Sequence, residues 1–187
     1  MTRVGVLALQ GDVREHIHIL EALGADGVPV KKPEELGEVD ALVIPGGEST
    51  TIGKMAVRFG LLEPLRSAVG DGLPVYGTCA GMILLASAVS DGDQPLIGGL
   101  DVVVKRNAFG RQNESFEASL DVLGLDDPFH AVFIRAPWIE KVGSEVEVIA
   151  AVDDHPVMVR QDSILASSFH PELTQDGRIH QMLLEMA

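Results

Sequence analysis

The chain has one cysteine, Cys79, and it lies in the pentapeptide G-T-C-A-G at residues 77–81. A short apolar run precedes this pentapeptide, and an apolar stretch typical of a helix follows it. A turn of the form G-x-C-x-G between a strand and a helix presents its central residue as a nucleophile, and the helix start favours the thiolate. The Ala80 N–H would be placed to receive an oxyanion. The pattern predicts catalysis by Cys79, against the alternative of a buried structural cysteine.

A candidate base for this thiol lies in the segment S-F-H-P-E at residues 168–172. A thiol is mostly protonated at neutral pH, so a nearby base helps to activate it. His170 and Glu172 are two residues apart, which lets both point to one side of an extended chain. Glu172 could then fix the tautomer of His170 and stabilise its cation. A surface histidine beside a turn proline is the other interpretation.

The remaining five histidines offer no chemical context in the sequence, and we interpret them as structural or solvated. His16 and His18 are two residues apart on a predicted helix, so they face different directions and form a poor metal pair. The others are His130, His155 and His180. We expect no metal site, and a single cysteine excludes both an intramolecular disulfide and a cysteine-based zinc cluster.

A glycine pair lies in the segment P-G-G-E-S at residues 45–49, directly after an apolar run. Adjacent glycines let backbone amides turn toward a ligand, which suits an oxyanion hole or an anion site. A phosphate-binding loop over residues 47–54 is a weaker interpretation. Five residues separate Gly47 from Gly53, and Met55 replaces the hydroxyl that would reach magnesium. A tight turn without a ligand is the third possibility.

Short apolar runs alternate with helix-like stretches in the first half of the chain. This pattern predicts an α/β fold with three layers, α/β/α, around a mostly parallel central sheet. Sites in such folds gather at the carboxyl ends of the strands, where the three motifs lie. The predicted strands cover residues 4–9, 28–30, 40–44, 73–76, 100–105, 131–134, 146–152, 156–160 and 164–169. The first predicted helix begins after Asp12 and ends at Gly24, and four more helices cover residues 50–59, 61–69, 80–88 and 177–186.

Composition limits the class of protein. The chain has 187 residues, 14 Lys and Arg against 28 Asp and Glu, and a formal net charge of −14. Such a surface repels polyanions, so we expect no nucleic-acid partner. No linker divides the chain, which predicts one domain over residues 1–187. No run is long enough for a membrane span or signal peptide, so we expect no membrane association and a cytoplasmic location.

The three motifs, in this order along the chain, resemble those of the triad-type class I glutamine amidotransferases. Within that group, the sequence is most similar to the glutaminase subunits of pyridoxal 5′-phosphate synthases. Five segments carry this similarity and together span nearly the whole chain. They are L-Q-G-D-V-R-E-H at residues 9–16, P-G-G-E-S-T-T at 45–51, R-N-A-F-G-R-Q at 106–112, F-I-R-A-P at 133–137 and S-F-H-P-E-L at 168–173.

The resemblance implies a flavodoxin-like amidotransferase fold and a role for each motif residue. Cys79 would attack the side-chain amide of L-glutamine, His170 would move the proton, and Glu172 would orient His170. The Gly47 and Ala80 amides would form the oxyanion hole. No cofactor is needed for this chemistry. The resemblance implies that six residues bind glutamine: Gly47, Glu48, Ser49, Arg106, Ile134 and Arg135. Gln10 could also approach the oxyanion hole, although a turn role explains it equally well.

The resemblance also implies a partner, a synthase subunit that receives ammonia from the glutaminase within a heteromeric, ring-shaped complex. The helix after Asp12 and the loop at residues 49–51 are our candidates for the contact. Three other functions stay open: service to a different synthase, hydrolysis of esters or lactones by an elbow cysteine, and redox sensing by Cys79. The segments at residues 106–112 and 133–137 argue against a different synthase.

Overall fold

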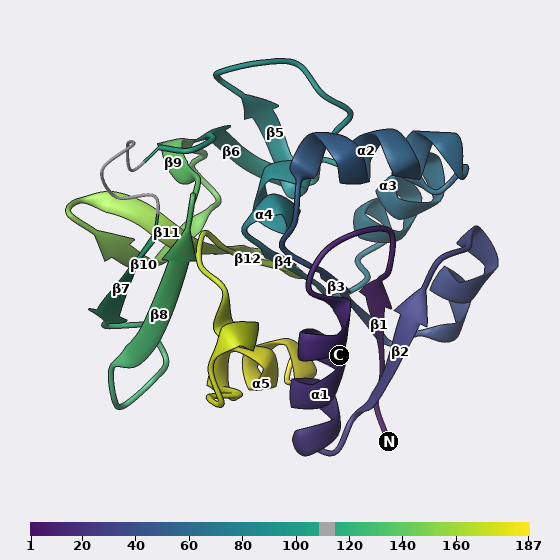
Figure 1. Cartoon of the computed structure of the whole chain (residues 1–187), viewed down its shortest axis with the longest axis horizontal. Helices are drawn as coiled ribbons and strands as arrows, with labels where there is room; N and C mark the ends of the chain where they lie inside the picture. The colour runs from purple at the N-terminus through teal and green to yellow at the C-terminus, as the bar shows by residue number, and fades with distance from the viewer. Residues whose placement is uncertain (109–114) are drawn as a thin grey trace.

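A seven-stranded sheet forms the centre of the computed structural model, which describes residues 1–108 and 115–187 (Figure 1). The strand order is β10-β11-β12-β4-β3-β1-β2. Its strands are β1 Arg3–Leu7, β2 Asp26–Val30, β3 Ala41–Ile44, β4 Val75–Thr78, β10 Glu147–Val152, β11 His155–Gln161 and β12 Ile164–Ser167. Five neighbouring strands, from β2 to β12, run parallel, and β11 and β10 join antiparallel. The prediction of a mostly parallel sheet is confirmed.

Helices cover both faces of this sheet, as predicted (Figure 1). On one face, α1 Val13–Ala22 and α5 Arg178–Leu184 pack through residues such as Leu20 and Ile179. On the other face lie α2 Ser49–Arg58, α3 Leu62–Gly70 and α4 Ala80–Leu85, with buried Ile52 and Leu65. The central strands β3, β4 and β12 are entirely buried because both faces are covered, which explains their continuous apolar runs.

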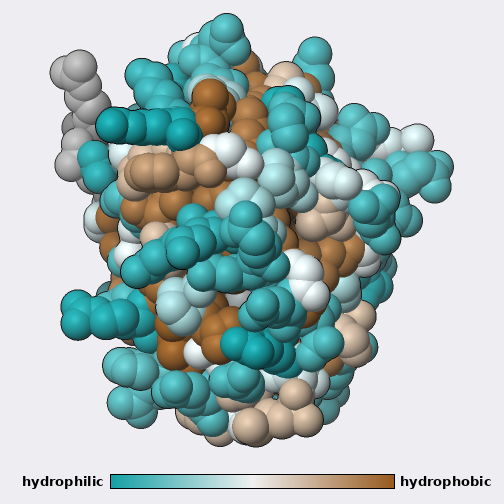
Figure 2. All heavy atoms as spheres, turned by 90° about the vertical axis from the view of Figure 1, so that its right-hand side faces the viewer, coloured by the Kyte–Doolittle hydropathy of each residue, from teal (hydrophilic) through white to brown (hydrophobic). Residues whose placement is uncertain are grey.

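Strand β2 forms one edge of the sheet, and its sequence suits that position. Pro29 lies within it, opposite Val6 of β1. A proline removes a backbone donor and is therefore tolerated only where the strand has a free side. Figure 2 shows the side of the molecule that carries this edge, where hydrophilic residues cover most of the surface and hydrophobic ones lie between and behind them.

The helix predicted over residues 80–88 is wrong beyond Leu85. Ala86–Val89 forms strand β5, which pairs with β6 Leu100–Lys105. Pairing with a buried neighbouring strand overrides the helical preference of the alanines. Strand β9 Trp138–Val142 pairs with the other side of β6 and completes a three-stranded sheet. The predicted strand over residues 100–105 is confirmed.

Strands β7 Ser115–Leu120 and β8 Phe129–Ile134 form a separate antiparallel pair. Strand β8 extends the prediction for residues 131–134, whereas β5, β7 and β9 and the 3-10 helix η1 Pro33–Glu38 were not expected. A second 3-10 helix, η3 Pro171–Leu173, follows β12. Within the described ranges, no helix has both the length and the apolar character that crossing a membrane requires.

Candidate active site

The parallel strands bring the sequence motifs to one edge of the sheet. Thr78 of β4 pairs with Ser167 of β12, and Gly77 pairs with Ile44 of β3. The residues that follow these strands therefore leave the sheet at the same level. The Cys79 N–H donates to the Ser167 carbonyl oxygen at 2.8 Å, which fixes the cysteine beside the chain that leads to His170. The predicted meeting of the three motifs at the carboxyl edge is confirmed.

Cys79 sits in a strained turn, as expected of a nucleophile elbow. Its φ of 48° lies in the left-handed region, which residues with a Cβ rarely adopt. The flanking glycines permit the crowding this turn creates. A Cβ on Gly81 would collide with the carbonyl oxygen of Ile44, and one on Gly77 would lie 2.7 Å from the carbonyl carbon of Gly81. The G-x-C-x-G spacing is therefore a steric requirement of the fold.

His170 and Glu172 form a tight pair. His170 Nδ1 lies 2.6 Å from Glu172 Oε1, and the Glu172 side chain is fully buried. The His170 N–H donates to the Val132 carbonyl oxygen of β8, which fixes the backbone of the segment. Pro171 begins η3, a turn that brings the carboxylate back to the imidazole ring. Because Nδ1 faces Glu172, Nε2 is the ring nitrogen left to serve the thiol.

The electrostatics of the pair favour a charged imidazole. Burial opposes the charge on His170, but hydrogen bonds with Asp12, Cys79 and Glu172 outweigh burial and raise its pKa to about 12. Burial raises the pKa of Glu172, and the contact with His170 offsets part of that increase. Asp12 Oδ2 lies 3.5 Å from His170 Nδ1 and adds a second carboxylate on the same side of the ring.

The glycine loop after β3 packs directly against the loop after β1. The Asp12 N–H donates to the Gly46 carbonyl oxygen at 3.3 Å, and the Glu48 N–H donates to Gln10 Oε1 at 2.8 Å. Because the peptide is trans, the Gly47 N–H points away from Asp12. A Cβ on Gly47 would lie 2.5 Å from Gln10 Oε1, and the φ of 155° is one that residues with a Cβ rarely adopt, so glycine suits this position.

A cavity of about 400 Å³ opens over these loops. It holds the predicted nucleophile, the predicted base and all six residues expected to bind glutamine. Glu172 lies behind the cavity wall and does not line it. The lining residues are Gln10, Asp12, Gly47, Glu48, Ser49, Cys79, Ile83, Arg106, Asn107, Ile134, Arg135 and His170.

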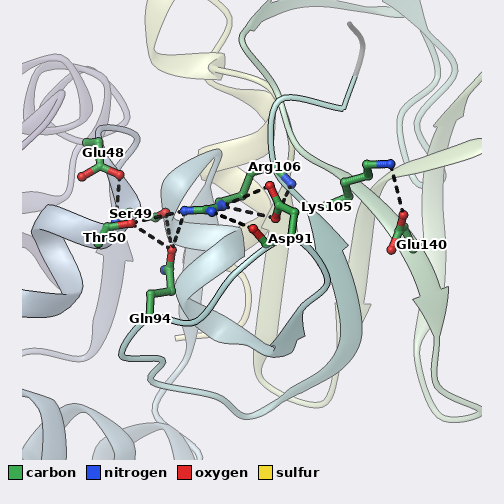
Figure 3. Close-up of polar contacts among 8 residues, drawn as sticks. All are labelled: Glu48, Ser49, Thr50, Asp91, Gln94, Lys105, Arg106 and Glu140. Carbon is green, nitrogen blue, oxygen red and sulfur yellow. Dashed lines mark hydrogen bonds and ion pairs between the residues drawn. The ribbon is translucent and has the colours of Figure 1, made fainter.

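Arg106 is held at the cavity wall by a polar network (Figure 3). Its Nε lies 3.2 Å from Asp91 Oδ1, and its Nη1 donates to Gln94 Oε1 at 3.4 Å. Gln94 Oε1 also accepts from the hydroxyls of Ser49 and Thr50 at the start of α2. The network therefore links the segment between β5 and β6 to the helix after the glycine loop.

Glu48 caps helix α2 as well as lining the cavity. Its carboxylate accepts from the backbone N–H groups of Thr50 and Thr51 and from the Thr51 hydroxyl. These bonds, led by the one from the Thr51 hydroxyl, lower the pKa of Glu48. A charged carboxylate at the helix start also suits the helix dipole.

The end of β8 forms another part of the cavity wall. Ile134 ends this strand, and Arg135 follows with a φ of 44°. A left-handed conformation at a residue with a long side chain is a local strain of the kind found around binding sites. In the segment predicted at residues 106–112, only residues 106–108 lie within the described ranges; residues 109–112 lie outside them.

Three residues of the site were missed by sequence reasoning. Asp12 was expected only to begin a helix. His16 and His180 were interpreted as lacking a chemical context, whereas His16 Nε2 lies 3.5 Å from Glu172 Oε2 and His16 Nδ1 lies 2.8 Å from His180 Nε2. One signal was available, because His16 falls three residues after Val13 and four before Leu20, on the apolar face of the helix.

Asp12, His170 and Glu172 also have the residue types of a metal site, with ligand atoms within 4.8 Å of one another. However, His170 Nδ1 and Glu172 Oε1 are at hydrogen-bond distance, 2.6 Å. A metal between them would require a longer separation, since each ligand bond is about 2 Å. The distance between His170 Nδ1 and Glu172 Oε1 therefore suits a shared proton better than a bound metal ion.

Sequence comparison supplies a family for this geometry. The profile of the SNO glutamine amidotransferase family matches residues 6–187. The chain is 65% identical over 187 residues to the pyridoxal 5′-phosphate synthase subunit PdxT of Parafrankia sp. strain EAN1pec, covering 98% of this chain and 92% of the relative. It is 60% identical over 186 residues to PdxT of Streptomyces coelicolor, covering 98% and 92%.

Solved structures give the same fold. A crystal structure of a glutamine amidotransferase superposes with a TM-score of 0.94 at 53% identity, covering 98% of this chain and 97% of the other. PurLQS from Thermotoga maritima superposes with a TM-score of 0.73 at 17% identity, covering 98% of each chain. The predicted flavodoxin-like amidotransferase fold is confirmed.

Proposed function

The chain belongs to the SNO glutamine amidotransferase family, and from this premise we propose that it is the glutaminase subunit of a pyridoxal 5′-phosphate synthase. It hydrolyses L-glutamine to L-glutamate and ammonia through Cys79, His170 and Glu172. The observation that carries the proposal is the 2.6 Å contact of His170 with Glu172 beside the strained Cys79. This arrangement supports the proposal because a catalytic triad needs a nucleophile, a base and an orienting carboxylate.

The reaction begins with attack of the Cys79 sulfur on the side-chain amide carbon of glutamine. The thiol proton passes to His170 Nε2, and Glu172 stabilises the imidazolium through Nδ1. The high pKa of His170, about 12, favours this ion pair. The amide oxygen becomes an oxyanion, which the N–H groups of Gly47 and Ala80 stabilise.

The second half of the reaction releases the products. His170 returns its proton to the amide nitrogen, the carbon–nitrogen bond breaks, and ammonia leaves a glutamyl thioester on Cys79. Water then loses a proton to His170 and adds to the thioester carbonyl. The carbon–sulfur bond breaks, and glutamate departs with Cys79 restored.

Charged groups around the cavity suit a zwitterionic amino acid. Arg106 and Arg135 offer partners for its carboxylate, and Glu48 carries a negative charge for its ammonium group. Asp91 holds Arg106 in place, so little side-chain freedom is lost on binding. Ser49 and Ile134 complete the binding site.

A synthase subunit receives the ammonia. The exposed side of α1, with Arg14, His18 and Glu21, and the exposed Thr51 of α2 are candidate contacts. Both elements adjoin the oxyanion loop through Asp12 and Glu48, so docking there has a physical route to the catalytic centre. The heteromeric assembly is ring-shaped in this proposal.

Glutamate release from L-glutamine tests the proposal. The chain is assayed alone and mixed with a cognate synthase subunit, with the Cys79→Ala variant as the control. We expect release to rise on mixing and to vanish in the variant. Hydrolysis of model esters without hydrolysis of glutamine in the mixture would instead indicate an elbow-type esterase.

A further inference from the structure

Two histidines from distant parts of the chain meet behind the proposed triad. His16 of α1 and His180 of α5 are both fully buried, and His16 Nδ1 lies 2.8 Å from His180 Nε2. Neither residue lines the cavity. Buried polar side chains of this kind are costly unless they are paired, so the contact needs a physical account.

Both rings are neutral at physiological pH. Burial lowers the pKa of His180 to about 4. Burial, together with the nearby His180 and His170, lowers the pKa of His16 well below 6.5. A neutral imidazole has one N–H and one acceptor nitrogen, so the 2.8 Å contact uses one N–H from one of the rings.

The position of Glu172 indicates which of the two histidine rings donates its N–H in this contact. Its Oε2 is buried and has no hydrogen-bond partner among the described residues, but His16 Nε2 lies 3.5 Å away. A carboxylate favours the tautomer that presents an N–H to it, so His16 carries its proton on Nε2. Thr78 Oγ1, at 3.3 Å, accepts from the same N–H. The Nδ1 of His16 is then an acceptor, and His180 Nε2–H donates to it.

This assignment also explains an unpartnered atom. His180 Nδ1 is buried and has no hydrogen-bond partner within the described ranges. In the opposite arrangement it would carry a proton, leaving a buried donor unsatisfied while the His16 Nε2 lone pair faced the carboxylate. In the assigned arrangement, His180 Nδ1 carries no proton, so the unpartnered atom is an acceptor and no buried N–H is left without a partner.

We propose that His16 is a positioning residue that keeps Glu172 ionised and aimed at His170, with His180 fixing the tautomer of His16. The inference rests on the proposed function. The groups facing Glu172 are His170, Asp12, His16 and the ring of Tyr76. Asp12 is negative, and among these four groups only His170 and His16 offer an N–H to the carboxylate.

Replacement of His16 by Phe removes the N–H and keeps an aromatic ring in the helix. Glu172 then holds a proton at higher pH, so the acid limb of kcat/KM moves upward by about one pH unit. We expect kcat to fall about 10- to 100-fold, the range typical of outer partners of catalytic groups. KM for glutamine stays unchanged because His16 does not touch the cavity.

Two matched variants separate positioning from stability. His16→Gln places an amide N–H near the position of Nε2, so it should restore the acid limb to within about a third of a pH unit of wild type. His130→Gln changes an exposed histidine of β8 that does not line the cavity, and it should leave the whole profile unchanged. An acid limb that stays in place in His16→Phe would overturn the proposal, whatever the loss of stability.

A second experiment tests the tautomer of His16 directly and does not require catalytic activity. Nitrogen-15 NMR of the histidine-labelled protein reports the tautomer of each ring. We expect His16 to be neutral with its proton on Nε2 between pH 6 and 8, and His180 likewise. A proton on His16 Nδ1 would contradict the inference. Because this result does not depend on glutamine hydrolysis, it distinguishes failure of the inference from failure of the proposed function.

Discussion

The backbone of Gly46 lies directly against the imidazole ring of His170. A Cβ built on Gly46 would collide with His170 Cε1 and lie 2.9 Å from Nδ1. The glycine before the proposed oxyanion donor thus also makes room for the proposed base. The position of the glycine loop and the position of the His170 ring therefore depend on each other.

Replacement of Gly46 by Ala should therefore damage activity more than stability. The added methyl group displaces the His170 ring from Glu172, and we expect kcat to fall about 100-fold or more. Glutamate release and thermal unfolding are measured on the same samples. Gly37→Ala is the matched control, since a Cβ there meets nothing within 4 Å. Equal activity in both variants would show that the contact does not matter.

Glu172→Gln tests the orienting carboxylate. A neutral amide stabilises the imidazolium less than a carboxylate does, and its NH₂ group can face Nδ1 and reverse the tautomer of His170. We expect kcat to fall about 10²- to 10⁴-fold, less than in His170→Asn, which removes the proposed base itself. Steady-state glutamate release with the synthase subunit measures both. A Glu172→Gln variant as active as wild type would remove this residue from the triad.

Asp91→Asn tests whether the ion pair with Arg106 serves substrate binding. Asp91 holds the guanidinium through Nε at 3.2 Å. We expect KM for glutamine to rise about two- to fivefold with kcat nearly unchanged, the scale of a partly exposed ion pair. Glu140→Gln is the control, because it breaks the neighbouring Lys105–Glu140 pair outside the cavity (Figure 3). The same KM in both variants would show that the Asp91–Arg106 ion pair does not serve substrate binding.

The buried histidines predict acid sensitivity of the fold. His180 has a native pKa of about 4 against an ordinary value of 6.5. Between these pH values the unfolded chain binds a proton that the native state does not. The free energy of unfolding therefore falls as pH falls through this window, by about 1.4 kcal/mol per pH unit for this group. His16 acts in the same direction.

Urea unfolding between pH 7 and 4.5 measures this slope. In His180→Phe, the slope of the free energy of unfolding against pH should decrease by the contribution of one proton, about 1.4 kcal/mol per pH unit. Ile179→Val changes the adjacent buried residue and should lower stability by about 1 kcal/mol without changing the slope. A slope in His180→Phe equal to that of wild type would show that His180 does not cause the acid sensitivity.

The sequence allowed prediction of the elements that carry the site, because each is short, apolar and bounded by glycine or proline. Cys79 and His170 stood out since their neighbours have steric roles visible in the sequence, such as the glycines beside Cys79. Strand β7 was missed although Phe116, Ala118 and Leu120 alternate along it. Its exposed side carries Ser115, Glu117 and Ser119, so the alternation typical of a half-buried strand was present in the sequence.

The buried histidine pair could not be predicted, since its members are 164 positions apart in the sequence. Their contact depends on α1 and α5 packing on the same face of the sheet, which only the topology determines. Likewise, the end of the helix at Leu85 follows from the pairing of β5 with β6, a long-range contact. Local patterns predict elements, whereas such contacts come from the fold as a whole.

The most direct test of the account is covalent labelling of Cys79 by a glutamine analogue. An L-amino acid with a chloromethyl ketone in place of the side-chain amide binds as glutamine does and alkylates the attacking nucleophile. We expect complete inactivation with one adduct per chain, on the Cys79 peptide, and protection by excess glutamine. Mass spectrometry locates the adduct. Inactivation with the adduct on another residue would contradict the account. So would unchanged glutamine hydrolysis by protein whose Cys79 is fully labelled.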